Sequence, residues 1–170
     1  MSKNVNEAFE ILIGRLKHSE TESAAAAAHR RSIESRLSTD FDLKRMFRSG
    51  SFGHGTSLSN ISDIDFFAVY PTAKLKKNSS SSLTAIKESL AARFPNTGVY
   101  VDSPAVVVPF ANGLQRHEII PADYILSEGG CNVYDIPNRY GAWMRSSPKA
   151  HNGWVNEANK EFNGKLKQLI

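Results

Sequence analysis

Two aspartates, Asp63 and Asp65, lie directly before a short apolar run and are the side chains best placed to do chemistry. The run from Phe66 to Val69 is aromatic and β-branched and is soon followed by Pro71, which predicts a buried β-strand. Side chains at positions i and i+2 of a strand point to the same face, about 6–7 Å apart along it. Two carboxylates that close repel each other unless a cation lies between them, and their hard oxygens suit Mg²⁺. The pair therefore predicts a divalent metal site.

A third acidic residue, Glu118, leads into the apolar pair Ile119-Ile120. Asn112-Gly113 is a strong hairpin signal, so Glu118 is expected on the return strand over residues 114–120. An acidic side chain that enters an apolar strand is destabilising unless it is paired or binds a metal. Two interpretations follow: a third carboxylate that faces the aspartates from a neighbouring strand, or an ion pair with Arg116 or a nearby lysine.

A turn at Gly50 and Ser51 precedes the aspartates and offers backbone N–H groups and a hydroxyl to a polyphosphate. The loop that follows is not a Walker A motif, because Thr56 stands where that motif requires lysine. It is not the dinucleotide fingerprint either, because Leu58 stands where a third glycine is required. We interpret residues 47–70 as a nucleoside triphosphate site built on carboxylates and a Gly-Ser turn.

The bulk properties of the chain fit a single folded domain. It has 170 residues, 41% of them hydrophobic and 22% charged, which leaves room for a real core. The formal charge of +4 is compatible with an anionic small molecule but is too small to require nucleic acid. The single cysteine, Cys131, excludes an internal disulfide and is expected in a loop. With no membrane-length apolar run and no signal-peptide pattern, we expect a cytoplasmic protein without a membrane partner.

The apolar periodicity predicts a chain that mixes helices and strands. Helices are expected over residues 4–18, 20–38, 83–94 and 148–169, and strands over residues 43–47, 66–69, 98–101, 105–110 and 114–120. Residues 74–82 are expected to form a flexible loop, and residues 123–142 to be irregular. This order supports α+β and α/β folds equally.

Several side chains carry their own expectations. One of the serines in residues 79–82 and Ser147 are expected to cap the helices that follow them. His117 alternates to the face opposite Glu118 and is expected to be structural. His18 and His29 are expected on the surface, and Trp154 on the packed face of the last helix.

At this point the residues resemble a known superfamily, the nucleotidyltransferases of the DNA polymerase β type. The resemblance rests on Gly50-Ser51, Gly55-Thr56, Ser62-Asp63-Ile64-Asp65 and the run from Glu118 to Ala122. The closer likeness is to the bacterial branch related to cyclic GMP–AMP synthase and oligoadenylate synthase, the cyclic-oligonucleotide synthases of antiphage defence. Residues of the later segment also look like that branch: Ile136-Pro137, Trp143, Pro148-Lys149-Ala150-His151, Trp154-Val155-Asn156 and Asn159.

The resemblance implies one catalytic domain over residues 1–170, with a polymerase β-like core. Its mixed sheet, over about residues 43–122, would be flanked by the helices in residues 4–38 and 148–169. Asp63, Asp65 and Glu118 would be the catalytic residues and the ligands of Mg²⁺ (or Mn²⁺), and Gly50 and Ser51 would hold the triphosphate.

The implied partners are nucleoside triphosphates, ATP or GTP foremost, and nucleic acid is not required. The hydroxyl of one nucleotide would attack the α-phosphate of another, and pyrophosphate would leave. The implied product is a cyclic di- or oligonucleotide second messenger. Arg145 and Lys149 would be further phosphate contacts.

Two departures from the family pattern keep alternatives open. The third carboxylate of the family is usually aspartate, whereas this chain offers Glu118, which reaches farther. The family continues into a helical C-terminal lobe, and this chain ends at Ile170, where we expect that lobe to begin. One alternative is therefore a nucleotidyltransferase that modifies a protein, a tRNA end or a small molecule. The other is a nucleotide-binding module with impaired catalysis.

Overall fold

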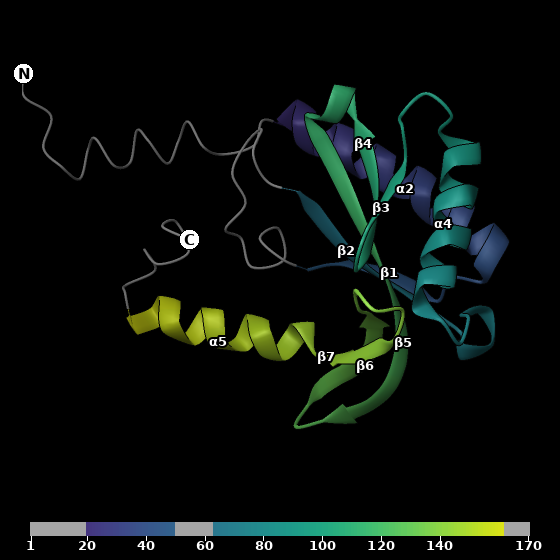
Figure 1. Cartoon of the computed structure of the whole chain (residues 1–170). Coiled ribbons are helices and arrows are strands. Elements are labelled where there is room, and N and C mark those ends of the chain that lie inside the picture. Colours follow the sequence, from purple (N-terminus) through teal and green to yellow (C-terminus); the bar gives the residue numbers. More distant parts are fainter. Residues whose placement is uncertain (1–19, 50–62, 162–170) are drawn as a thin grey trace, which may run out of the picture.

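The computed structural model describes residues 20–49 and 63–161 of the chain (Figure 1). The helix expected over residues 4–18 and the end of the one expected over residues 148–169 lie outside this part. In chain order the helices and strands are α2 (Glu20–Phe41), β1 (Arg45–Arg48), β2 (Ile64–Tyr70), α4 (Ser79–Arg93), β3 (Tyr100–Asp102), β4 (Ala105–Phe110), β5 (Gln115–Glu128), β6 (Cys131–Pro137), β7 (Trp143–Ser146) and α5 (Pro148–Glu161). Short 3₁₀ turns occur at Thr72–Lys74 and Ala111–Gly113.

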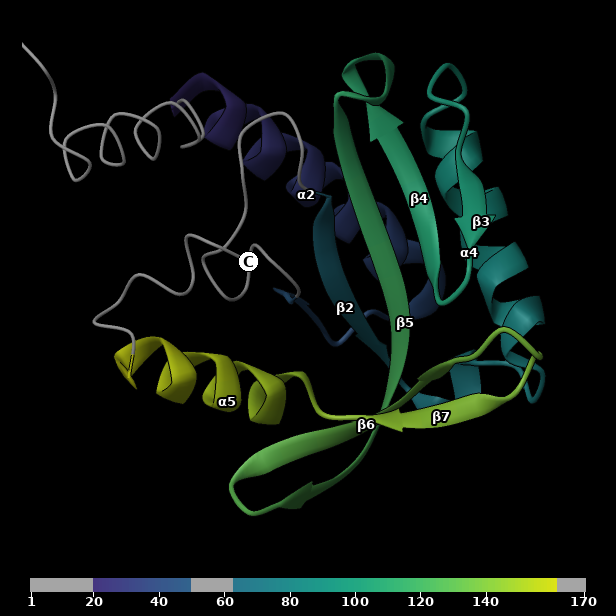
Figure 2. The same cartoon turned by 60° about the vertical axis from the view of Figure 1, so that its left-hand side comes forward.

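The described strands form one mixed sheet. Its order is β1-β2-β5-β4-β3, and β6 pairs with both β5 and β7. The pair β2 and β5 is parallel, and the other pairs are antiparallel. Helices α2 and α4 lie together on one side of this sheet, whereas α5 leads away from β7 on the other side (Figures 1 and 2). The fold is therefore α+β, with a mixed sheet and flanking helices, as the polymerase β-like resemblance implies.

The main core lies between the sheet and the helices α2 and α4. Side chains of β2 alternate, so Ile64, Phe66, Ala68 and Tyr70 pack in the cluster that these helices complete. Phe67 and Val69 belong to a second cluster on the opposite side, with residues of β5 and β6: Ala122, Tyr134 and Ile136. We call the side of the sheet opposite α2 and α4 the open face.

The hairpin between β4 and β5 is confirmed. Phe110 on β4 pairs with Gln115 on β5. In the turn that joins these two strands, Asn112 and Gly113 have positive φ values of 56° and 89°. Among the described residues, the strands before it and the helices α2 and α4 are confirmed to within a few residues.

The expectation of irregular structure over residues 123–142 is wrong. β5 runs on to Glu128, bends at a bulge between Tyr124 and Leu126, and turns through Gly129-Gly130 into β6 and then β7. Tyr124 and Leu126 are 47% and 40% exposed, so this stretch lacks the buried apolar run that marks the earlier strands. In β6 the buried residues Tyr134 and Ile136 alternate with less buried ones, so no continuous apolar run marks that strand either.

The expectation of a flexible loop that extends to Ser82 is also wrong, since α4 already begins at Ser79. Its N-cap is Asn78, whose side chain accepts a hydrogen bond from the N–H of Ser81. Ser79 and Ser82 are buried rather than in solvent, and the Ser79 hydroxyl donates to the carbonyl of Ala142. The serine run therefore joins α4 to the segment before β7.

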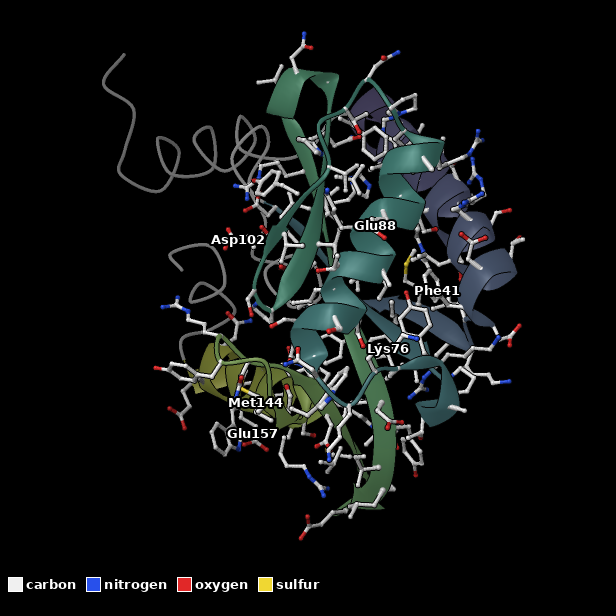
Figure 3. All side chains as sticks on the ribbon, turned by 45° about the vertical axis from the view of Figure 1, so that its right-hand side comes forward. Phe41, Lys76, Glu88, Asp102, Met144 and Glu157 are labelled. Atoms are coloured by element: carbon white, nitrogen blue, oxygen red, sulfur yellow. The ribbon has the colours of Figure 1, made fainter. Side chains whose placement is uncertain are left out.

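Two expected side-chain environments need correction. His29 is half-buried and stacks on Phe110, with ring centroids 3.8 Å apart, instead of lying on the surface. Trp154 is 74% exposed instead of packed, because α5 projects away from the sheet. Figure 3 shows Glu157 of α5 and Met144 of β7 in the lower part of the molecule, away from Glu88 on α4.

Cys131 begins β6 rather than lying in a loop. Within the described ranges, none of the helices has the length and apolar character needed to cross a membrane.

Candidate active site

The register of two parallel strands brings the acidic residues together. Asp65 on β2 is directly opposite Glu118 on β5. Neighbouring strands lie about 4.8 Å apart, so two side chains at one register position on one face are within reach of each other. The Glu118 carboxyl group hydrogen-bonds with the side chains of both Asp65 and Asp63. The structure therefore gathers Asp63, Asp65 and Glu118 at one end of the open face, and their catalytic roles stay predictions.

Arg116 completes this cluster. Its Nη1 lies 3.2 Å from Asp63 Oδ2, and its Nη2 lies 3.1 Å from Glu118 Oε1. Both interpretations of Glu118 thus hold together: it faces the aspartates and it pairs with Arg116. From the sequence, Arg116 is expected only as an ion-pair partner of Glu118. The period of two that places Asp63 beside Asp65 also places Arg116 beside Glu118, and this was the signal for its role.

Two of the carboxyl groups resist ionisation. Burial, and then the negative charge of Asp63, raise the pKa of Asp65 from 3.8 to about 6. Burial, and then the charges of Asp63 and Asp65, raise the pKa of Glu118 from 4.5 to about 7, against the opposing charge of Arg116. The cluster therefore carries negative charge that Arg116 neutralises only in part.

The donor set fits a hard divalent cation, although it is not arranged around one. In the part of the chain that the structure describes, no three His, Cys, Asp or Glu side chains are positioned to enclose a metal ion. Arg116 engages one oxygen each of Asp63 and Glu118, which leaves carboxylate oxygens of the cluster for another ligand. Carboxylate oxygens are the ligands that Mg²⁺ takes from proteins. Asp63, Asp65 and Glu118 are thus the residues that could hold it.

The expected phosphate-binding residues Gly50 and Ser51 lie outside the described residues. Ser49, which precedes them, is buried, and its backbone N–H donates to the carbonyl of Asp65 at 2.9 Å. This hydrogen bond fixes the end of β1 beside the acidic cluster.

The opposite side of β5 anchors the strand that carries Glu118. His117 is fully buried, stacks on Phe66 with ring centroids 5.7 Å apart, and its Nε2 lies 3.3 Å from the carbonyl of Ala26 on α2. Burial lowers the pKa of His117 from 6.5 to about 4, so its ring is neutral at physiological pH. The expectation that His117 is structural is confirmed.

Arg145 and Lys149 are engaged elsewhere in the protein. Arg145 Nε lies 2.9 Å from Asp135 Oδ1, and Lys149 Nζ donates to the carbonyl of Gly130 at 3.0 Å. Both contacts lie at the β6–β7 end of the molecule, and contact of these side chains with phosphate stays a prediction.

Comparison with known proteins shows which family the chain belongs to and which structures share its fold. The model of the Second Messenger Oligonucleotide or Dinucleotide Synthetase (SMODS) domain family matches residues 3–159, which include all three carboxylates. A search of curated proteins finds no match to the sequence.

Several solved structures of bacterial proteins share the fold. CdnC of E. coli MS115-1, solved with ATP, superposes with a TM-score of 0.63 at 21% identity and covers 91% of this chain and 51% of its own. CdnG of Bradyrhizobium diazoefficiens, solved with GTP, gives a TM-score of 0.75 at 12% identity and covers 90% of this chain and 46% of its own. DncV of Vibrio cholerae, a cyclic AMP-GMP synthase solved with the linear intermediate pppA(3′,5′)pG, gives 0.72 at 13% identity and covers 93% and 62%. This chain therefore spans about half to three fifths of the length of these proteins.

Proposed function

Since this chain belongs to the Second Messenger Oligonucleotide or Dinucleotide Synthetase domain family, we propose that it is a nucleotidyltransferase that joins nucleoside triphosphates into a cyclic di- or oligonucleotide. The observation that carries the proposal is the convergence of Asp63, Asp65 and Glu118 on the open face, through the pairing of β2 with β5. Three carboxylates close together are unfavourable for the fold alone, and burial raises the pKa of two of them, Asp65 and Glu118. A function explains why the three side chains lie together.

The proposed reaction needs little covalent chemistry from the protein. The hydroxyl of the acceptor nucleotide forms a new bond to the α-phosphorus, the bond to the bridging oxygen breaks, and pyrophosphate leaves. Asp63, Asp65 and Glu118 would hold Mg²⁺ or Mn²⁺, which supplies positive charge to the triphosphate and makes the acceptor hydroxyl easier to deprotonate. The β2–β5 register fixes the carboxylates before substrate arrives, and such positioning supplies most of the rate in phosphoryl transfer.

The substrates we propose are ATP and GTP. The structures of CdnC with ATP and of CdnG with GTP, which share this fold, support that choice. Gly50 and Ser51 would bind the β- and γ-phosphates, and the hydrogen bond from Ser49 to Asp65 supports their nearness to the carboxylates. By the family resemblance we place the reaction in the cytoplasm, in defence against phage.

A second candidate is a nucleotide-binding module with impaired catalysis. The ion pairs of Arg116 with Asp63 and Glu118 favour it, because they hold two of the three carboxylates that a metal would need. The longer side chain of Glu118 in place of aspartate points the same way. Binding of ATP without release of pyrophosphate would establish this candidate.

The test is pyrophosphate release from the four common nucleoside triphosphates by the full chain with Mg²⁺ or Mn²⁺. We expect Asp63→Ala and Asp65→Ala each to lower the rate at least about a hundredfold without unfolding the protein. Asp123→Ala is the matched control: Asp123 pairs with Tyr70 at the other end of the same two strands, and its carboxylate accepts a hydrogen bond from Thr72. Activity that survives both cluster substitutions contradicts the assigned roles. Mass spectrometry of the product separates a cyclic nucleotide from a modified protein, tRNA or small molecule.

A further inference from the structure

Arg116 places a positive charge within the acidic cluster, in contact with two of its carboxylates. It precedes Glu118 by two residues on β5, and its guanidinium contacts carboxylates from two strands with two different nitrogens. The contacts are not confined to the surface, since the side chains of Arg116, Asp63 and Glu118 are 33%, 36% and 22% exposed. Arg116 on β5 thus contacts both Glu118 on its own strand and Asp63, the residue directly before β2.

The hydrogen bonding of the Arg116 guanidinium is incomplete among the described residues. Its Nε is buried and has no hydrogen-bond partner among the described residues, although a guanidinium can donate five hydrogen bonds. Its guanidinium also forms a hydrogen bond with the side chain of Tyr100 on the edge strand β3. A buried donor without an acceptor is destabilising, so a ligand that supplies a further acceptor would be favoured here.

The same contacts explain why the carboxylates, although close together, do not form a metal cage. Among the described residues no group of three acidic, histidine or cysteine side chains is positioned to hold a metal ion. Arg116 takes one oxygen each from Asp63 and Glu118. A divalent cation would need those carboxylates and would be repelled by the guanidinium beside them.

We propose that Arg116 is a built-in counter-ion that makes metal binding depend on nucleotide. In the metal-free protein it neutralises Asp63 and Glu118 and excludes a free divalent cation. When a nucleoside triphosphate arrives, the guanidinium exchanges a carboxylate partner for phosphate oxygens, which it binds through parallel hydrogen bonds. The released carboxylates then become available to the cation that accompanies the triphosphate. This inference rests on the proposed function of the site, and it makes Arg116 a residue that couples the two ligands.

The test measures the affinity of the full chain for Mn²⁺, by electron paramagnetic resonance of the free ion, with and without a nonhydrolysable ATP analogue. Arg116→Gln is expected to bind Mn²⁺ alone about tenfold more tightly than wild type, because a repelling charge is removed. The gain in Mn²⁺ affinity that the analogue produces is expected to shrink by about the same factor. Equal or weaker binding of Mn²⁺ alone by Arg116→Gln, or an unchanged gain, would overturn the proposal.

Three further variants make the result specific. Arg116→Lys keeps the charge and is expected to bind Mn²⁺ alone within about twofold of wild type; tenfold tightening in this variant would contradict an effect of charge. Arg36→Gln is the matched control, since Arg36 pairs with Asp40 on α2, on the other side of the sheet, and no change in Mn²⁺ affinity is expected. If Arg116→Gln does not fold, Arg116→Met is the second neutral variant.

The outcome is separable from that of the proposed function. Tighter Mn²⁺ binding by Arg116→Gln, in a protein that releases no pyrophosphate, would support the counter-ion role and reject the transferase. Pyrophosphate release by wild type, with unchanged Mn²⁺ affinity in Arg116→Gln, would support the transferase and reject the counter-ion role.

Discussion

The two faces of β5 place neighbouring residues in opposite chemical situations. His117 points toward α2 and is fully buried, and Glu118 lies on the open face beside two other carboxylates. Burial disfavours the charged form of both, since it lowers the pKa of His117 to about 4 and raises the pKa of Glu118 to about 7. The imidazole is stable in its neutral form against Phe66. The carboxyl group instead lies where a cation would restore its charge.

One strand thus contributes to stability on one face and to the candidate site on the other. The residues of β2 and β5 that face α2 and α4 are apolar or neutral, and they hold the sheet. The residues on the open face at the same level are charged, and they store unfavourable electrostatic energy that a ligand can relieve. Substitutions on the two faces should therefore have opposite effects on the stability of the metal-free protein.

The largest effect on stability is expected on the helix-covered face. Leu37→Ala on α2 removes a fully buried side chain and should lower the free energy of unfolding by about 3 kcal/mol. Leu114→Ala is the control, because Leu114 is 70% exposed, and it should change stability by less than about 0.5 kcal/mol. Urea denaturation monitored by circular dichroism measures both. Equal effects of the two substitutions would contradict this placement of the core.

His117 should make the protein sensitive to acid. Its folded-state pKa of about 4 lies below the usual 6.5, so the stability it contributes is complete above pH 6.5 and is lost as the pH falls through about 4. The free energy of unfolding of wild type should fall by about 2–3 kcal/mol more than that of His117→Gln over this range. Parallel stability curves for the two proteins would show that His117 is not a buried neutral residue.

Asp65 should have the opposite effect on how the stability of the protein depends on pH. Its folded-state pKa of about 6 lies above the usual 3.8, so the metal-free fold loses stability as the pH rises from about 4 through 6. Asp65→Asn should therefore be more stable than wild type at pH 7.5 and equally stable at pH 4. The shift corresponds to at most about 3 kcal/mol, which solvent screening of a partly exposed group reduces to about 1 kcal/mol. Lower stability of Asp65→Asn at pH 7.5, in thermal unfolding without metal, would make the carboxylate structural.

The sequence predicts the elements whose apolar pattern is strong. β2 and β4 are buried runs bounded by clear signals, and Asn112-Gly113 specifies the hairpin that returns Glu118 to the sheet. The proximity of Asp63 and Asp65 follows from the strand period alone. The position of Glu118 beside Asp65 does not, because it depends on a parallel pairing between strands about fifty residues apart. From the sequence it was therefore one of two interpretations of Glu118.

The elements that the sequence analysis missed have weaker local signals. The end of β5 and the strand β7 carry exposed residues such as Tyr124 and Met144, and in β6 buried residues such as Tyr134 and Ile136 only alternate with less buried ones. The cap at Asn78 was missed because four serines follow it and each is a plausible cap. The bridging role of Arg116 required the structure, since it joins residues on two strands.

The most direct test of the central claim is a crystal structure of the full chain with Mn²⁺ and a nonhydrolysable ATP analogue, with anomalous diffraction to locate manganese. We predict manganese within about 2.5 Å of carboxylate oxygens of Asp63 and Asp65, with Glu118 in the same cluster and the triphosphate against it. Manganese and triphosphate bound away from these three residues, at saturating concentrations of both, would contradict the account.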